Sequence, residues 1–140
     1  MIQRLQTIWL LFAAILSFAT FNISFFSGYQ LVDNIKQFQR FTAMSDTFLM
    51  IFTGIVCAGS LITIFLYKNR DLQFKVTLIL FALSLLNLVF YYMGYNKLIE
   101  TDRTVGITAI IALAIPLFLL LAARGIYQDH KLVKSADRLR

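Results

Sequence analysis

The chain has 140 residues, of which 59% are hydrophobic and 14% are charged, and its mean hydropathy is +0.75. Soluble domains carry about 25% charged residues, so this composition excludes a water-soluble enzyme, a secreted disulfide scaffold and a disordered chain. Cys57 is the only cysteine, so no disulfide forms within the chain. The formal net charge is +6, and its meaning depends on where the charged residues lie.

Four long stretches without a charged side chain organise the sequence. Each has about the 20 residues that an α-helix needs to cross roughly 30 Å of hydrocarbon. The stretches are apolar on all sides and lack the alternation of a membrane β-strand. We therefore predict an all-α membrane protein, a bundle of four transmembrane helices at about 5–27, 46–67, 74–95 and 104–124. These helices would form one transmembrane domain over residues 1–125, followed by a basic tail over residues 126–140.

Lysine and arginine gather on one side of the predicted membrane. If both termini lie inside, nine basic residues face the cytoplasm and four face the outside. Cytoplasmic loops of membrane proteins carry an excess of Lys and Arg, so the distribution predicts that both termini are cytoplasmic. Topology and anionic lipid at the cytoplasmic face then account for the basic charge without a nucleic-acid partner.

Residues that could carry chemistry are scattered. His130 lies in the tail and Cys57 within the second span, and the sequence has no metal-ligand spacing, phosphate-binding loop or nucleophile–base pair. No ionisable residue lies deep inside a span, where a proton pump or a proton-coupled carrier keeps one. We therefore predict a protein that is not an enzyme, with no catalytic residues, no cofactor and no metal.

Short patterns predict how the spans begin and pack. Asp46 follows Ser45 at the start of the second span, where these side chains would cap the helix and meet its positive dipole end. Small residues recur four positions apart in three spans, and this spacing lets helix backbones approach closely. The pairs are Ala13 and Ser17, Gly54 and Ala58, and Thr108 and Ala112.

Neutral polar side chains fall at similar heights in the four spans. Counted from the cytoplasmic side, the candidates for one shared polar layer in the outer half are Asn22, Thr53, Asn87 and Thr108. This layer has two interpretations. It is a pocket for a lipid headgroup or small ligand, or it is a set of interhelical hydrogen bonds worth about 0.6 kcal/mol each. We favour the second.

The tail combines an apolar stripe with basic flanks, which is the pattern of a short basic amphipathic helix on the cytoplasmic side. Such a helix over 126–140 could lie on the inner leaflet, dock on a partner protein or act only as an anchor for the topology. The residues predicted to bind a partner are Leu132, Val133, Ala136 and Leu139 in the stripe, and Lys131, Lys134, Arg138 and Arg140 beside it.

Both ends of the sequence resemble one family. The start, Met1-Ile-Gln-Arg-Leu-Gln-Thr7, leads straight into an apolar helix, and the close combines Leu121-Ala-Ala-Arg-Gly-Ile126 with Lys131-Leu-Val-Lys-Ser-Ala-Asp-Arg-Leu-Arg140. These motifs resemble the Bacteroidota inner-membrane proteins catalogued as domain of unknown function 4293, which have a similar length and four predicted spans. The resemblance implies a bacterial cytoplasmic (inner) membrane, and it supplies no catalytic residues to carry over.

Two functions follow as hypotheses. The first is an accessory or structural subunit of a larger complex of membrane proteins, with a translocon or insertase of the protein-export machinery as the first partner to test. Basic segments beside such a channel would also face ribosomal RNA, the one setting in which we expect nucleic acid. The alternative is a small binding or transport protein for a lipid, quinone or other apolar metabolite. A ligand among the polar layer would favour the alternative, and side chains bonded across a closed core would count against it.

Overall fold

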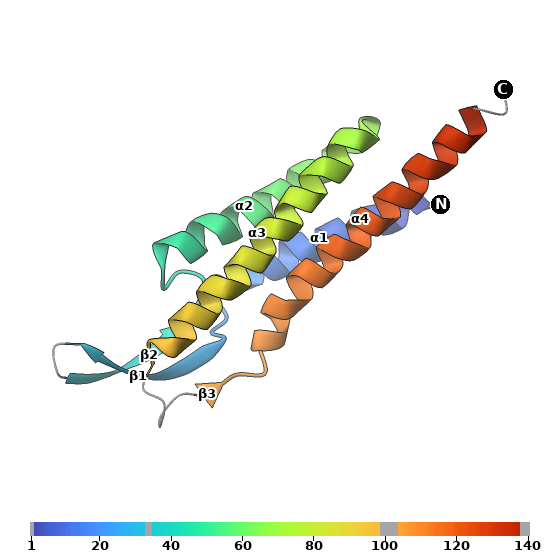
Figure 1. The fold of residues 1–140 in the computed structure, drawn as a ribbon. Helices are drawn as coiled ribbons and strands as arrows, with labels where there is room; N and C mark the ends of the chain where they lie inside the picture. The colour runs from blue at the N-terminus through green and yellow to red at the C-terminus, as the bar shows by residue number, and fades with distance from the viewer. Residues whose placement is uncertain (1, 33–34, 99–103, 138–140) are drawn as a thin grey trace.

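The computed structural model describes residues 2–32, 35–98 and 104–137, and the side chains within 5–29, 36–98 and 104–132. Helices make up most of this part of the chain (Figure 1), and they are α1 (Ile2–Ala19), α2 (Thr47–Phe65), α3 (Arg70–Asn96) and α4 (Ala109–Asp137). The short 3-10 helix η1 (Leu66–Lys68) lies between α2 and α3. The strands are β1 (Phe26–Val32), β2 (Ile35–Phe41) and β3 (Thr104–Val105).

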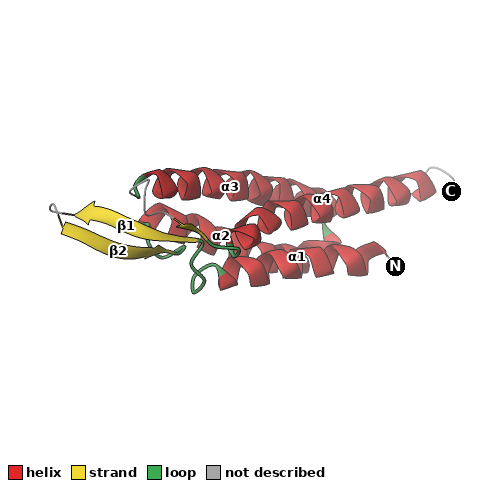
Figure 2. Cartoon of the chain, turned by 90° about the horizontal axis from the view of Figure 1, so that it is seen from below, coloured by secondary structure: helices red, strands yellow, loops and turns green. Residues whose placement is uncertain are grey.

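The helices form a four-helix bundle, which the sequence predicts. α1 packs against α2 and α4, and α3 packs against the same two helices, so each helix has two main neighbours. The chain reverses direction between consecutive helices. The N-terminus and the C-terminus therefore lie at one end of the bundle, and the strands lie at the other end (Figure 2).

The centre of the bundle is apolar and receives one large aliphatic side chain from each helix. Leu10, Val56, Leu80 and Leu119 are buried together there. α2 and α3 approach closely at this level, since Gly59 has no side chain. The side chain of Leu80 occupies the space where a Cβ on Gly59 would lie. This core separates the polar residues near the two ends of the bundle.

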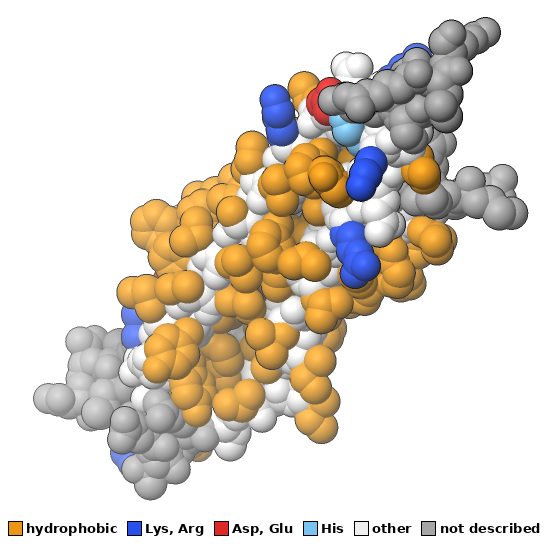
Figure 3. Space-filling model, turned by 45° about the vertical axis from the view of Figure 1, so that its right-hand side comes forward, with side chains coloured by type: hydrophobic (Ala, Val, Ile, Leu, Met, Phe, Trp, Pro, Cys, Tyr) orange, Lys and Arg blue, Asp and Glu red, His pale blue; other side chains and the backbone are white. Residues whose placement is uncertain are grey.

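The outside of the bundle is also hydrophobic. On the face seen in Figure 3, hydrophobic side chains cover the middle of the molecule, and Lys and Arg side chains lie toward its ends. Three helices are long and apolar enough to cross a membrane, over Thr47–Lys68, Arg70–Asn96 and Ala109–Leu132. The apolar part of α1, Leu5–Ala19, is shorter than these three.

The first helix ends earlier than the sequence predicts. The span expected at 5–27 stops at Ala19, and turns lead from there into β1. Phe25 and Phe26 continue the apolar run in the sequence, but they are buried against the strand residue Phe41 and the end of α3. Hydrophobicity alone does not separate these residues from a helix, because pairing with β2 decides their backbone conformation.

The strands form a small antiparallel sheet, in which β2 and most of β1 lie between the first two predicted spans, whereas β3 lies at the start of the fourth. β1 pairs with β2 from Phe26 opposite Phe41 to Val32 opposite Ile35, and β3 pairs with the start of β1. The strand order is β2-β1-β3, so β1 lies in the middle. The sequence signal for this hairpin is a pair of β-forming runs on either side of Asp33-Asn34.

An aromatic cluster fastens the sheet to the end of α3. The ring of Phe26 stacks on Phe41 with their centroids 5.0 Å apart, and it meets the ring of Tyr95 edge-on at 5.5 Å. Phe41 lies against Gly94, where an added Cβ would overlap its ring. A residue without a side chain at this position therefore lets the hairpin sit directly on α3.

The last helix begins later and ends later than the predicted span at 104–124. β3 occupies its expected start, and α4 then continues past Gly125 to Asp137. Ala122 and Ile126 are buried on either side of Gly125, and this packing offsets the roughly 1 kcal/mol that a glycine costs within a helix. The tail is therefore helical through Asp137 as an extension of α4, and residues 138–140 lie outside the described part.

Candidate functional site

Two of the four residues predicted to form the polar layer meet in the bundle. The amide Nδ2 of Asn87 on α3 donates a hydrogen bond to Oγ1 of Thr53 on α2, with 2.9 Å between the two atoms. Both side chains are buried. The bond ties α2 to α3 in the half of the bundle that is nearer the sheet, which is the arrangement that the structural interpretation requires.

The other two predicted members lie outside this layer. Asn22 is exposed in the turns beyond α1, because that helix ends at Ala19. Thr108 precedes α4, and its hydroxyl donates to the backbone carbonyl of Ser24. The prediction was wrong for Asn22 and Thr108 for one reason. Their heights were counted along helices, and the chain is not helical at either position.

Different residues complete the layer. Ser17 and Thr20 come from α1 and the turn after it, and Ser84 and Tyr91 come from α3. The hydroxyl of Ser17 donates to the carbonyl of Ala13 at 2.7 Å, and the Thr20 and Ser84 hydroxyls also bond to backbone carbonyls three residues before them. Such bonds satisfy buried hydroxyls locally, without a ligand. From here on, the polar layer means Ser17, Thr20, Thr53, Ser84, Asn87 and Tyr91.

The polar layer surrounds almost no free space. The cavity at this level has a volume of about 10 Å³, close to the smallest space that holds one water molecule. Among the described residues, Oδ1 of Asn87 and the hydroxyl of Tyr91 are buried without a hydrogen-bond partner. The layer can therefore receive at most a molecule of about the size of water, and it has no room for a lipid or a quinone.

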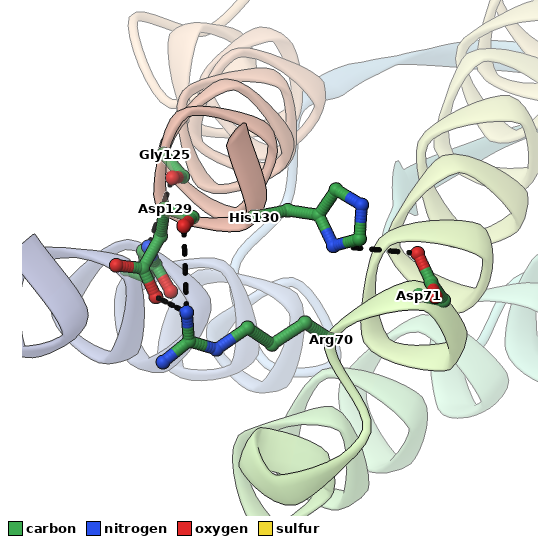
Figure 4. A network of polar contacts seen from close by, with 6 residues as sticks. Arg70, Asp71, Gly125, Asp129 and His130 are labelled. Carbon is green, nitrogen blue, oxygen red and sulfur yellow. Dashed lines mark hydrogen bonds and ion pairs between the residues drawn. The ribbon is translucent and has the colours of Figure 1, made fainter. Parts of the chain in front are cut away.

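A second polar group joins α3 to α4 at the end of the bundle where the termini lie (Figure 4). Nη1 of Arg70 lies 3.2 Å from Oδ2 of Asp129, and Nδ1 of His130 lies 3.4 Å from Oδ1 of Asp71. Consecutive residues of α3 therefore contact consecutive residues of α4. His130 looks isolated in the sequence, because its partner Asp71 lies far away in the chain.

The same region contains a contact between α1 and α4. Nε2 of Gln6 donates to the carbonyl of Gly125 at 2.9 Å, and Gln6 is buried. A Cβ on Gly125 would lie 2.9 Å from Cγ of Gln6, so the glycine lets the two helices come close. The part of α4 where the predicted tail begins therefore contacts α1 through Gln6 and α3 through Arg70 and Asp71.

The structure describes only part of the predicted tail site. The side chains of Lys131 and Leu132 are exposed on α4. Helical backbone continues beyond them to Asp137 and projects past the other helices (Figures 1 and 2). The remaining side chains of the predicted site fall outside the described ones, and these are Val133, Lys134, Ala136, Arg138, Leu139 and Arg140.

The cap at the start of α2 forms with one of its two predicted residues. Oδ1 of Asp46 accepts a hydrogen bond from the backbone N–H of Phe48 at 3.0 Å, and Asp46 also lies 3.7 Å from Nζ of Lys97. The hydroxyl of Ser45 instead accepts from the backbone N–H of Thr42 at 2.9 Å. Asp46 therefore has a structural role in which its charge faces a helix N-terminus and a lysine.

The small-residue pairs differ in where they lie. Ala13 and Ser17 are fully buried between helices, and Ala112 is buried as well. Gly54 behaves differently, because a Cβ added there would meet nothing within 4 Å. Gly54 therefore makes no close contact with another helix among the described residues.

Cys57 and His130, the two residues that the sequence singles out for possible chemistry, have separate partners in the structure. Sγ of Cys57 donates to the carbonyl of Ala14 at 3.6 Å, a contact between α2 and α1. Within the described residues, His, Cys, Asp and Glu form no group of three that could hold a metal ion.

Comparison with known proteins identifies the family. The family model described as Domain of unknown function (DUF4293) matches residues 2–139. The chain belongs to this family. The DUF4293 match includes the two terminal motifs on which the resemblance rests, apart from Met1 and Arg140, and it covers α1, α2, α3 and α4. Comparisons with the curated proteins and with the solved structures find no match.

Proposed function

We propose that this DUF4293 protein is a non-catalytic subunit of a larger complex in the bacterial cytoplasmic membrane, with both termini in the cytoplasm. Three helices of membrane-spanning length and the hydrophobic outer surface support the membrane location. The excess of Lys and Arg at the end that carries the termini supports the orientation.

The observation that carries the proposal is the closed polar layer. Thr53 and Asn87 bond to each other across it, and the space beside them is about 10 Å³. Pockets that hold small molecules have volumes of about 300–1,000 Å³, so the middle of the bundle does not serve a carrier of a lipid or quinone. A closed bundle of this kind is suited to holding other proteins in place.

The parts that project from the bundle are the natural points of contact. At one end, α4 extends beyond its neighbours and exposes Leu132 beside Lys131 (Figure 1). At the other end, the hairpin of β1 and β2 carries an exposed aromatic pair, Tyr29 and Phe38, with ring centroids 5.5 Å apart. We infer that α4 binds a partner protein and that its basic residues lie near anionic lipid headgroups.

The partner belongs to the membrane, because most of this chain lies within it. A translocon or insertase is the first candidate, since a cytoplasmic helix beside such a channel would lie near the ribosome. Its lysines and arginines would then face ribosomal RNA phosphates, and the interaction would weaken as salt rises. Outside that setting the proposal includes no nucleic acid.

Native purification tests the proposal directly. The full-length protein is extracted in a mild detergent, and its co-purifying proteins are identified by mass spectrometry. We expect another membrane protein at a fixed ratio to this chain. Recovery of this chain alone, as a monomer or a homo-oligomer, would contradict the proposal.

A pair of variants then tests the tail. Leu132→Asp together with Val133→Asp breaks the apolar stripe and should release the partner while the bundle still folds. Lys68→Glu on η1 is the control, because it changes the net charge by the same amount at the same end of the bundle and leaves the tail unchanged. Retention of the partner by the double variant would show that the stripe is not the contact.

A further inference from the structure

A larger cavity opens at the end of the bundle that carries the termini. Its volume is about 350 Å³, within the range of small-molecule pockets. Each of the four helices contributes to its wall. The lining residues are Gln6 and Thr7 from α1, Ile64 and Phe65 from α2, Tyr67 from η1, Arg70 and Gln73 from α3, and Asp129 from α4. We call this space the terminal cavity.

Two buried carboxamides keep the walls of the terminal cavity in place. Nε2 of Gln6 donates to the carbonyl of Gly125 at 2.9 Å, and Nε2 of Gln73 donates to the carbonyl of Thr63 at 3.1 Å. The first bond joins α1 to α4 and the second joins α3 to α2. The cavity is therefore held by contacts between both pairs of helices and exists before any ligand arrives.

The wall of the cavity presents two opposite charges side by side. Arg70 and Asp129 lie 3.2 Å apart, and their side chains are 26% and 15% exposed. A ligand with only a negative charge would be attracted by Arg70 and repelled by Asp129, and a ligand with only a positive charge would meet the reverse. A zwitterion with an anionic and a cationic group can satisfy both side chains at once.

The rim of the cavity is apolar. Phe65 at the end of α2 and Tyr67 in η1 lie at the end of the apolar stretch Thr47–Lys68, and they are 78% and 56% exposed. Aromatic residues at such a position lie at the membrane interface, where lipid headgroups meet their acyl chains. A ligand here would thus have a polar headgroup in the cavity and an apolar part outside it.

We propose that the terminal cavity binds the headgroup of a zwitterionic phospholipid, with its phosphate on Arg70 and its primary ammonium on Asp129. The glycerol and acyl chains leave the cavity past Phe65 and Tyr67 into the leaflet. This site rests on the membrane location in the proposed function but is separate from the partner contact on α4, so the lipid site and the partner contact can fail independently.

Native mass spectrometry of the full-length protein tests the site. The protein is stripped of lipid in detergent and offered equal amounts of phosphatidylethanolamine, which carries both charges, and phosphatidylglycerol, which carries only the negative one. We expect phosphatidylethanolamine to be retained more strongly by about tenfold, the effect of one charge-assisted hydrogen bond. Equal retention of the two lipids would overturn the proposal.

Substitutions of Arg70 and Asp129 should change the retention of the two lipids in different ways. Arg70→Met should lower the retention of both lipids by about tenfold, because each loses its phosphate partner. Asp129→Asn should lower retention of phosphatidylethanolamine and raise that of phosphatidylglycerol, because the repulsion of an anion is removed. This reversal also shows that the variant still folds and binds. If Asp129→Asn lowers both lipids equally, the zwitterion assignment is wrong.

Two controls separate this site from general attraction to the membrane. Arg124→Met removes a positive charge from exposed α4 without touching the terminal cavity, so lipid retention should stay unchanged. An equal loss in that variant would overturn the proposal. Free phosphoethanolamine carries the same charges without acyl chains, and it should not displace the lipid at equal concentration. Displacement would assign the cavity to a soluble zwitterion instead.

Discussion

The polar layer and the terminal cavity belong to one bundle but use polar side chains differently. Around Thr53 and Asn87 the groups are neutral, three of the six bond to backbone carbonyls of their own segment, and the free volume is about 10 Å³. Around Arg70 and Asp129 the groups are charged, they come from separate helices, and the volume is about 350 Å³. The bundle is therefore closed near the sheet and open near the termini, and the lipid site that we propose lies in the open half.

The largest loss of stability is expected when a buried side chain is removed from the polar layer. Tyr91→Ala removes a buried ring that meets Phe25 edge-on at 4.8 Å, and it should lower the free energy of unfolding by about 3–5 kcal/mol. Tyr92→Ala is the control, because the neighbouring side chain is exposed and should cost far less. Denaturant titration in detergent measures both. Equal losses would mean that the layer is not closed around Tyr91.

A smaller effect is expected at the contact between the hairpin and α3. Gly94→Ala places a Cβ against the ring of Phe41 and should cost about 1–3 kcal/mol through overpacking. Gly54→Ala makes the same chemical change in a helix where the Cβ meets open space, so it should be neutral or slightly stabilising. Thermal unfolding of the two variants compares them directly. Loss of stability in the Gly54 variant alone would contradict the packing described.

A substitution at the terminal cavity should lower the free energy of unfolding less than a substitution in the polar layer. Arg70→Met breaks the ion pair with Asp129, and because both side chains are partly exposed, the cost should be about 1 kcal/mol or less. The same denaturant titration measures this loss. A cost as large as that of Tyr91→Ala would mean that the charged pair holds the fold and is not kept for binding.

The smallest effect concerns the hydrogen bond between Thr53 and Asn87 across the polar layer. In a double-mutant cycle of Thr53→Val and Asn87→Leu, the coupling energy should be about 0.6 kcal/mol, the average for such bonds between membrane helices. A coupling near zero would show that the two side chains do not bond in the folded protein.

The sequence predicts the helical bundle well because charged residues bound the apolar stretches. The predicted second and third spans, 46–67 and 74–95, fall almost entirely within α2, η1 and α3. The end of α1 was missed because Phe25 and Phe26 are as apolar as a helix interior, and only their pairing and packing in the sheet reveal the strand.

The candidate sites were predicted less completely than the fold. Thr53 and Asn87 both lie within regular helices, whose heights can be counted from the sequence, and the two side chains bond to each other. Asn22 was misplaced once α1 ended at Ala19. The pair of Arg70 and Asp129 joins residues 59 positions apart, and a single sequence carries no local pattern for such a contact.

Photo-crosslinking in intact cells tests the central claim, that α4 holds a partner protein, most directly. A photo-reactive amino acid replaces Leu132 on the projecting part of α4, and a second version replaces Leu117, which is similarly exposed within the apolar surface of the same helix. We predict that position 132 forms an adduct with another protein and that position 117 forms adducts with lipid. Adducts from position 132 that contain only lipid or a second copy of this chain would contradict the account.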